Sequence, residues 1–423
     1  MRLATQQLNK LNSNMIFNNF IYLLYKLFIS LRRIFLFREK KNFFIKNLHI
    51  NEIKLKNSDI FFGYYDLDPF NQKLNEVLIH IKSKKTNKVS LAKYNLITKK
   101  ICIFDTSELW NFQFGARLSW LKNNKISANK TYNGEAKNYI WKLENNKISI
   151  STIIDFPIFD WNYDASKGLT LNFFELDKFR KGYGYLSDKV KNPIKNSSLY
   201  IYHIVSNTLE EVITLFQAKK KIFYNKKNPN IYNEHFNHPK WSPDGSSFLV
   251  LYVFNTDINR QTKLIYYNIS LKKMKIWSNE DSEIISHFCW VSNNEFIFSG
   301  KMINTNFGYF RGFIDSHKFL KINEITIPSD GHPSFNISSN TMVLDTYPDR
   351  YSEQNLYYLD FTVNKFVKIC SLLSPLKYID NNKCDLHPRI TKNGKMIIID
   401  SSYTGDRTIL IIEDFNEFNK LNS

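Results

Sequence analysis

Four of the nine histidines occupy the same place in a recurring sequence pattern. In each copy the histidine stands three residues before an aromatic or aliphatic residue, and a polar turn and an apolar strand follow. The four copies are His238-Pro-Lys-Trp, His287-Phe-Cys-Trp, His332-Pro-Ser-Phe and His387-Pro-Arg-Ile. Imidazole nitrogens are common ligands of divalent transition ions such as Mn, Fe and Zn, and a neutral imidazole is a good general base. The histidines could therefore build a metal site if the fold brings them together; otherwise each bonds the main chain of a neighbouring strand.

The same frame extends to three earlier stretches that lack the histidine. They are Leu67-Asp-Pro-Phe, Arg117-Leu-Ser-Trp and Ile158-Phe-Asp-Trp, and each precedes another polar turn and apolar strand. The seven frame positions are 67, 117, 158, 238, 287, 332 and 387. Their spacings fall between 41 and 55 residues, except for one of 80 that indicates an insertion around 180–200. A period of about 40–50 residues is typical of propeller blades, which must stack because one blade cannot bury its own face.

This repeat predicts an all-β fold, a seven-bladed β-propeller with an N-terminal amphipathic helix. We expect a basic helical segment over 1–41 and the propeller over 42–423, with the stretch 42–57 supplying a strand that closes the ring onto the last blade. A β-sandwich with extra strands is the alternative, but sandwiches do not repeat a signature at a fixed period. The aromatic residues three positions after the frame are expected in the core: Trp120, Trp161, Trp241, Trp290 and Phe335.

The first strand of each blade lines the central channel of a propeller, so the frame residues are expected to face one opening. Side chains two positions apart share a strand face, and the residues two positions after each histidine should join the same lining. These are Lys240, Cys289, Ser334 and Arg389, with Asp385 two positions before His387. The pattern therefore predicts imidazoles and cations together at one channel mouth.

The chain has a formal charge of +19, from 58 Lys and Arg against 39 Asp and Glu. This excess favours an anionic partner, either nucleic acid, anionic lipid or an acidic glycan. Nucleic acid is disfavoured because no basic run interleaved with aromatic residues forms a recognised binding module. Residues 15–37 are apolar but carry charged and amide side chains, which predicts a helix lying on an anionic membrane surface or packed on the propeller rather than one that spans a bilayer.

Other common classes lack their sequence markers. The sequence contains no Gly-rich phosphate loop, no GxSxG and no HExxH motif. The four cysteines form no CxxC pair, which argues against a disulfide scaffold and a zinc ribbon. Few cysteines and no clear secretory signal favour the cytoplasm, with membrane association through the N-terminal helix.

The stretch His238-Pro-Lys-Trp-Ser-Pro-Asp-Gly and its fellows resemble TolB-type and WD40-like propeller repeats over about 58–415. The order of the histidine-bearing blades resembles oligogalacturonate lyases, and stretches such as GYYDLDPFN resemble propeller proteins that accompany bacterial surface-polysaccharide genes. The lyase resemblance implies a manganese ion in the central pocket and β-elimination of short uronate chains. It implies His238 as the general base and His287 and His387 as metal ligands. Two positions depart from the family pattern: Asp385 stands in place of a histidine, and Asn382 in place of a glutamine ligand.

If the protein is such a lyase, each candidate residue has an expected role. The metal ligands would be His287, His332, His387 and Asp385, and the catalytic pair would be His238, which abstracts the proton, and Arg117, which binds the substrate carboxylate. Substrate binding would further involve Lys240, Arg389 and Arg180, the last of which lies in the insertion with Tyr183 and Tyr185. The alternative is a non-catalytic propeller that binds a glycan or a partner protein in surface-polysaccharide biosynthesis.

Overall fold

The computed structural model describes residues 24, 42–45, 48–144, 147–185, 190–224, 230–278, 282–316 and 318–413. The helix predicted within residues 1–41 lies outside this part of the chain, apart from Leu24. Among the described residues, no helix has the length and apolar character needed to span a bilayer.

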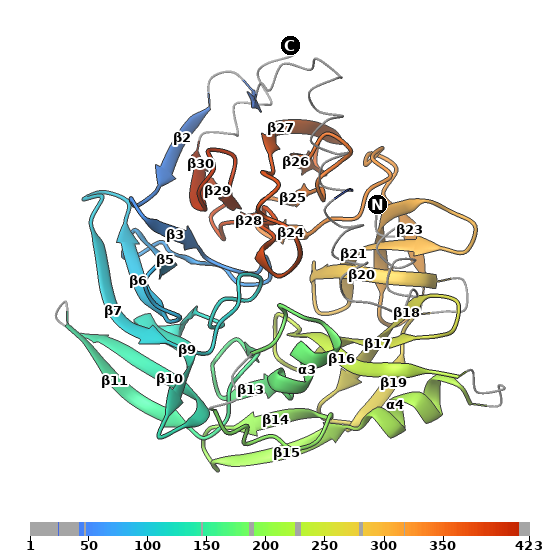
Figure 1. The fold of residues 1–423 in the computed structure, drawn as a ribbon. Coiled ribbons are helices and arrows are strands. Elements are labelled where there is room, and N and C mark those ends of the chain that lie inside the picture. The colour runs from blue at the N-terminus through green and yellow to red at the C-terminus, as the bar shows by residue number, and fades with distance from the viewer. Residues whose placement is uncertain are drawn as a thin grey trace.

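Seven antiparallel sheets formed by the described residues surround a central axis, as the repeat predicts (Figure 1). The first blade contains β3 (Ser58–Phe61), β4 (Phe70–Asn71), β5 (Glu76–Ser83), β6 (Val89–Asn95) and β7 (Ile101–Ser107). The second contains β8 (Ser119–Leu121), the short 3-10 helix η1 (Lys122–Asn124), β9 (Lys125–Tyr132), β10 (Glu135–Glu144) and β11 (Lys147–Ile154). The third contains β12 (Asp160–Trp161), β13 (Lys167–Thr170), β14 (Leu199–His203) and β15 (Thr208–Ile213).

The remaining blades follow in chain order. The fourth contains β16 (Tyr232–Trp241), β17 (Ser247–Asn255), β18 (Arg260–Asn268) and β19 (Lys273–Ile276). The fifth contains β20 (Ser282–Trp290), β21 (Glu295–Met302), β22 (Phe307–Phe313) and β23 (Phe319–Lys321). The sixth contains β24 (Pro333–Asn336), β25 (Thr341–Asp345), β26 (Glu353–Asp360) and β27 (Lys365–Leu373). The last contains β28 (Arg389–Ile390), β29 (Met396–Ser401) and β30 (Thr408–Glu413), preceded by the 3-10 helix η2 (Asp380–Asn382).

The ring is closed by a strand from the other end of the chain. Strand β2 (His49–Ile53) pairs with β30, with Ile50 opposite Ile412. The prediction that 42–57 closes the ring is thus confirmed, because β2 is the outermost strand of the last blade. One further strand, β1 (Phe43–Phe44), adds to the outer edge of the sixth blade beside β27.

The turn after the first strand of a blade explains the Asp-Gly and Asn-Gly pairs in the sequence. Gly245 has a φ of 71° and donates its N–H to the carbonyl of Ser242. The Asp244 carboxylate accepts the N–H of Ser246 at 2.9 Å. Since a positive φ is strained for side chains but not for glycine, these turns reverse the chain tightly and fix where the inner strand begins.

The aromatic side chains at the end of the frame pack between blades. Trp241 and Trp290 are buried, as predicted, and belong to two hydrophobic clusters. Trp120, Trp161 and Phe335 are only half-buried, although each packs against a core cluster.

Two helices interrupt the β pattern near the third blade. Helix α3 (Phe173–Phe179) lies between β13 and β14, just before the insertion predicted around 180–200, and α4 (Leu215–Ile222) lies between β15 and β16. The Asn172 side chain caps α3 by accepting the N–H of Glu175. After α3 the chain turns back, and the ring of Tyr185 stacks on Phe173 with centroids 4.6 Å apart. This packing holds the segment that follows α3 near the axis.

Candidate functional site

The four frame histidines lie together at the centre of the propeller. Their side chains are all buried, and successive ring centroids are 5.7 Å, 4.2 Å and 4.5 Å apart in the order of the blades. The ring of Tyr64 stands among them, with its centroid between 4.6 Å and 6.5 Å from each imidazole. Residues almost 150 positions apart in the chain are thus gathered in one cluster, as the circular repeat leads us to expect.

The backbone at several frame positions adopts an uncommon conformation. Arg117, His238 and His387 have φ values of 53°, 54° and 43°. In the fourth blade the pairing of β16 with β17 shifts register between Asn237 and Lys240, so that His238 lies at a bulge. Left-handed backbone costs a non-glycine residue about 1 kcal/mol or more, and such strain often occurs at functional sites. The bulge redirects the histidine side chain toward the axis.

Three of the imidazoles are oriented by a hydrogen bond at Nδ1. The Nδ1 atom of His287 lies 3.2 Å from Asp330 Oδ1, and that of His332 lies 2.9 Å from Asp345 Oδ1. His387 Nδ1 lies 2.7 Å from the carbonyl oxygen of Gly63. The Nε2 atoms of all three are buried and have no hydrogen-bond partner among the described residues.

This arrangement is the one that metal-binding histidines adopt. A carboxylate or carbonyl at one ring nitrogen fixes the tautomer and leaves the lone pair of the other nitrogen for the ion. A buried polar atom without a partner costs about 1–3 kcal/mol, so three such atoms in one cluster indicate a ligand. The residues therefore fit a divalent metal ion.

The protonation states suit the same interpretation. Burial lowers the pKa of His287 to about 3, and burial together with the charge of its neighbours lowers the pKa of His387 well below 6.5. His332 differs, because its burial is outweighed by the Asp345 carboxylate, which raises its pKa. Two of the three imidazoles are hence neutral at neutral pH, the form that coordinates metals, whereas the raised pKa of His332 makes a metal compete more strongly with a proton there.

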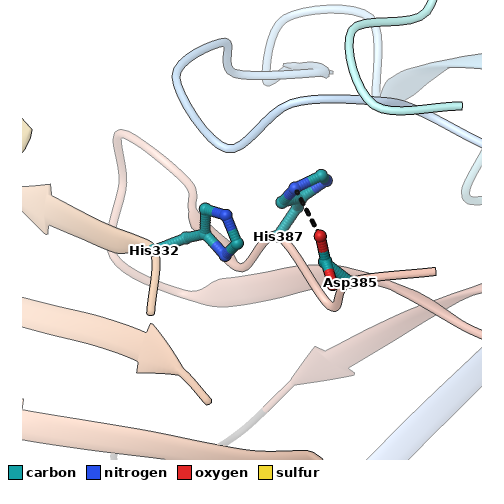
Figure 2. Close-up of side chains that lie close together, drawn as sticks. All are labelled: His332, Asp385 and His387. Carbon is teal, nitrogen blue, oxygen red and sulfur yellow. Dashed lines mark ion pairs between the residues drawn. The ribbon is translucent and has the colours of Figure 1, made fainter. Parts of the chain in front are cut away.

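A carboxylate completes a candidate donor set. The ligand atoms of His332, Asp385 and His387 all lie within 4.8 Å of one another (Figure 2). His387 Nε2 is 3.9 Å from Asp385 Oδ2, and the Lys383 ammonium is 2.7 Å from the same oxygen. Two imidazole nitrogens and a carboxylate oxygen suit Mn, Fe or Zn. Asn382, at the position compared with a glutamine ligand, does not join these donors. Its side chain bonds Arg407 and the carbonyl of Lys377.

The fourth histidine has different partners. His238 Nε2 lies 2.5 Å from the hydroxyl oxygen of Tyr64, and its Nδ1 has no hydrogen-bond partner among the described residues. Burial and the neighbouring charges hold the pKa of His238 well below 6.5, so that it is neutral at neutral pH. His238 does not belong to the group of His332, Asp385 and His387, so it could accept a proton while that group holds an ion.

Three of the predicted cations form ion pairs with carboxylates of the protein. Arg117 forms a bidentate ion pair with Asp66, and Lys240 forms an ion pair with Asp160 at 2.8 Å. The guanidinium of Arg389 bonds Asp400 and the carbonyl of Gly63. Each of these charges is thus matched by a carboxylate of the protein.

The sequence predicted that the histidines and the residues two positions after them share one lining, and the structure differs. Lys240, Cys289, Ser334 and Arg389 line a cavity of about 510 Å³ whose lining contains none of the four histidines. Two residues along a strand is about 6.6 Å, so these side chains lie further along the axis. Tyr65 lines the cavity, and its ring lies 4.7 Å from that of Tyr64. The two tyrosines thereby separate the imidazole end of the axis from the cavity end.

One predicted cation does lie at the imidazole end. The guanidinium of Arg180, which follows α3, stands 3.7 Å from the centroid of the Tyr183 ring. Its charge contributes to lowering the pKa values of His238 and His287. Burial alone would raise the pKa of Tyr183, but Arg180 and Lys383 lower it to about 8. The insertion thus brings positive charge to the imidazoles.

Several residues of the site were not identified from the sequence. Tyr64, Lys383, Asp330 and Asp345 all contact the cluster, yet none belongs to the frame. Tyr64 lies in the Gly-Tyr-Tyr-Asp stretch just before the first frame position, and Asp345 ends an inner strand of the sixth blade. Such a polar residue at the end of an apolar strand is the signal that could have indicated Asp345.

Comparison with known proteins gives a fold-level result. No family model and no curated protein matches the chain. An oligogalacturonate lyase from Vibrio parahaemolyticus is similar in structure, with a TM-score of 0.61, 14% identity and coverage of 88% of this chain and 96% of its own. An oligogalacturonate lyase in complex with manganese has a TM-score of 0.65, 12% identity and coverage of 88% and 95%. TolB from Acinetobacter baumannii has a TM-score of 0.40, 12% identity and coverage of 78% and 76%. The two lyase structures confirm the resemblance to oligogalacturonate lyases as a likeness of fold at low identity.

Proposed function

We propose that the protein is a metal-dependent lyase that cleaves uronate-containing oligosaccharides by β-elimination. The observation that supports this most is the buried group of His332, Asp385 and His387, whose possible ligand atoms all lie within 4.8 Å of one another. His287, His332, His387 and Asp385 would hold the ion. A bound divalent cation, manganese by analogy with the similar lyase structure, would neutralise the substrate carboxylate as charge develops on it.

The chain's own residues carry the proton chemistry. His238 takes the proton α to the carboxylate, the electron pair of that bond forms the new double bond, and the bond to the glycosidic oxygen breaks. The leaving oxygen takes a proton from solvent. In the required tautomer, His238 Nε2–H donates to the Tyr64 oxygen at 2.5 Å and the lone pair is on Nδ1. Arg180 supplies positive charge at this end of the axis. Arg117, Lys240 and Arg389 form ion pairs with carboxylates of the protein.

Purified protein loaded with manganese tests the proposal. Incubated with oligogalacturonates, it should produce the ultraviolet absorbance of a double bond conjugated to a carboxylate. Replacing His238 by alanine should abolish the product, while His203→Gln, which alters a half-exposed histidine paired with Glu210, should not. Equal rates in wild type and His238→Ala would show that His238 is not the base.

A second function is favoured by two observations. The pKa of His238 lies well below 6.5, which makes it a weak base, and Lys383 already pairs with Asp385. A propeller that binds an acidic oligosaccharide, or a partner protein of its biosynthesis, without turning it over is the alternative. Retained oligogalacturonate binding without product formation in the manganese-loaded protein would favour this alternative.

We also propose a cytoplasmic protein that contacts anionic membranes through its N-terminal segment. The net charge of +19 supports this part of the proposal. Sedimentation with vesicles of phosphatidylserine and phosphatidylcholine tests it, since binding should fall as the salt concentration is raised.

A further inference from the structure

The candidate metal site contains a positive charge of the protein itself. The Lys383 ammonium lies 2.7 Å from Asp385 Oδ2, the same carboxylate oxygen that is 3.9 Å from His387 Nε2 (Figure 2). The Asp385 side chain is only 3% exposed, and a buried carboxylate without a cation nearby is strongly unfavourable. Lys383 therefore neutralises the carboxylate that a metal ion at this site would use.

Lys383 is held so that its side chain can move while its backbone stays in place. The carbonyl of Lys383 accepts a hydrogen bond from Arg407 Nη2 at 2.9 Å. The ammonium donates to the Tyr183 hydroxyl at 2.7 Å, and it lies 5.1 Å and 5.2 Å from the ring centroids of Tyr183 and Tyr347. Because the side chain is 23% exposed, the ammonium can leave Asp385 toward solvent and still keep an aromatic neighbour.

A divalent ion and the ammonium compete for the same oxygen. A metal–carboxylate bond of about 2.2 Å at Asp385 Oδ2 would place the ion no more than about 4.9 Å from the Lys383 nitrogen. Two cations this close in a poorly solvated place repel each other strongly. We propose, building on the metal-dependent function above, that Lys383 is a built-in competitor of the metal ion. Its ammonium neutralises Asp385 in the metal-free protein, and metal binding displaces it from the carboxylate.

This exchange of cations keeps the buried carboxylate neutralised in both states. The metal-free protein is stabilised without an ion, and the ion is held less tightly than the donor atoms alone would allow. A lysine with a purely structural role would behave differently, because its removal would weaken the fold and the metal site together. Opposite effects of one substitution on stability and on metal affinity therefore distinguish the two roles of Lys383.

The manganese affinity of Lys383→Met tests the proposal, measured on the full chain from the electron paramagnetic resonance signal of free Mn²⁺ during titration. The variant should bind manganese at least about tenfold more tightly than the wild type, because the repulsion is gone, and should melt at a lower temperature in chelator. Lys377→Met is the matched control, since this exposed lysine lies just before η2 and pairs with Asp406; its manganese affinity should equal that of the wild type. In an Asp385→Asn background, most of the gain from Lys383→Met should disappear.

The wild type offers a second measurement that needs no substitution. Saturating manganese should increase the acetylation of Lys383 by N-hydroxysuccinimide acetate severalfold, measured by mass spectrometry, because the displaced amino group is more exposed. Acetylation of Lys377 should stay the same. Equal manganese affinity in the wild type and a folded Lys383→Met variant, or unchanged acetylation of Lys383, would overturn the competition and leave the metal site standing. Absence of manganese binding in both proteins would overturn the competition together with the metal-dependent function.

Discussion

The two ends of the propeller axis use the same inner strands but treat charge in opposite ways. At the imidazole end, His287 and His387 are buried and neutral, and their Nε2 atoms have no partner among the described residues. At the cavity end, Lys240 and Arg389 are each matched by a carboxylate of the protein. Each cation at the cavity end stands only two positions after a histidine, as Lys240 does after His238. The difference in charge compensation therefore arises from the hydrogen-bond and ion-pair partners of these side chains and not from their place in the fold.

Buried charge at the cavity end is compensated by carboxylates of the chain, whereas the imidazole end has buried nitrogens without a hydrogen-bond partner among the described residues. The pairs Asp66–Arg117 and Asp160–Lys240 join successive segments around the axis. Because removal of one partner leaves a charge in a poorly solvated place, these pairs stabilise the arrangement of the blades only as pairs. The buried imidazole nitrogens without a hydrogen-bond partner among the described residues cost stability.

The largest expected effect is the loss of metal binding at the imidazole end. His332→Ala and His387→Ala should each weaken manganese binding by more than about 100-fold, since removing even an outer partner of a metal ligand costs about 10–100-fold. Elemental analysis after loading and gel filtration measures this. Lys240→Met at the cavity end serves as the control and should keep the full metal content. If both ends changed metal content equally, the distinction between them would not hold.

The second effect concerns stability at the cavity end. Arg117→Met leaves the Asp66 carboxylate, whose side chain is 11% exposed, without its bidentate partner. Breaking a buried pair in this way should lower the free energy of unfolding by about 3–5 kcal/mol. Urea denaturation measures it, with Lys137→Met as the matched control, because the half-exposed pair of Lys137 with Asp155 should contribute less than about 1 kcal/mol. A loss as small as that of the control would mean that the axial pair is solvated.

The sequence repeat predicts the features of the fold that are the same in every blade. The period predicted the seven blades and the gathering of His238 and its fellows, because circular symmetry brings equal frame positions to one axis. It could not predict that Tyr64 and Tyr65 cross the axis, since this segment precedes the first copy of the frame. Lys240 and Arg389, two positions after His238 and His387, therefore lie on the other side of these tyrosines, and the spacing of the repeat does not reveal this.

The partners of the imidazoles could not be predicted for a related reason. Asp330, in the segment before β24, reaches His287 across 43 residues of sequence, and Asp345, at the end of β25, reaches His332 across 13. Their place depends on how neighbouring blades pack, which periodicity does not contain. The same holds for the carboxylates that pair with Arg117 and Lys240. The repeat gives the ring, whereas contacts between its members decide which side chains are left for a ligand.

The third effect is a sensitivity to acid that belongs to the imidazole end. Burial lowers the pKa of His287 to about 3, while the unfolded imidazole has its usual value of 6.5. Unfolding therefore takes up a proton below pH 6.5, and the free energy of unfolding falls as the pH falls from 6.5 toward 3, by about 1.4 kcal/mol per pH unit. Replacing His287 by asparagine should reduce that slope by this amount in chelated protein, measured by urea denaturation at several pH values. An unchanged slope in His287→Asn would show that the imidazole is solvated.

The smallest effect tests the residue that stands between the two ends. Tyr64→Phe removes the hydroxyl that lies 2.5 Å from His238 Nε2, and one neutral hydrogen bond contributes about 1 kcal/mol to stability. Without that oxygen, Nε2 has no acceptor, and the tautomer with a lone pair on Nδ1 loses its advantage. The variant should therefore lower the elimination rate about tenfold at unchanged metal content, with a far smaller change in the urea midpoint than Arg117→Met gives. Tyr65→Phe is the matched control, because the Tyr65 hydroxyl bonds the main chain of Phe288 and not an imidazole. A rate in Tyr64→Phe equal to that in Tyr65→Phe would make Tyr64 a spacer between the ends and nothing more.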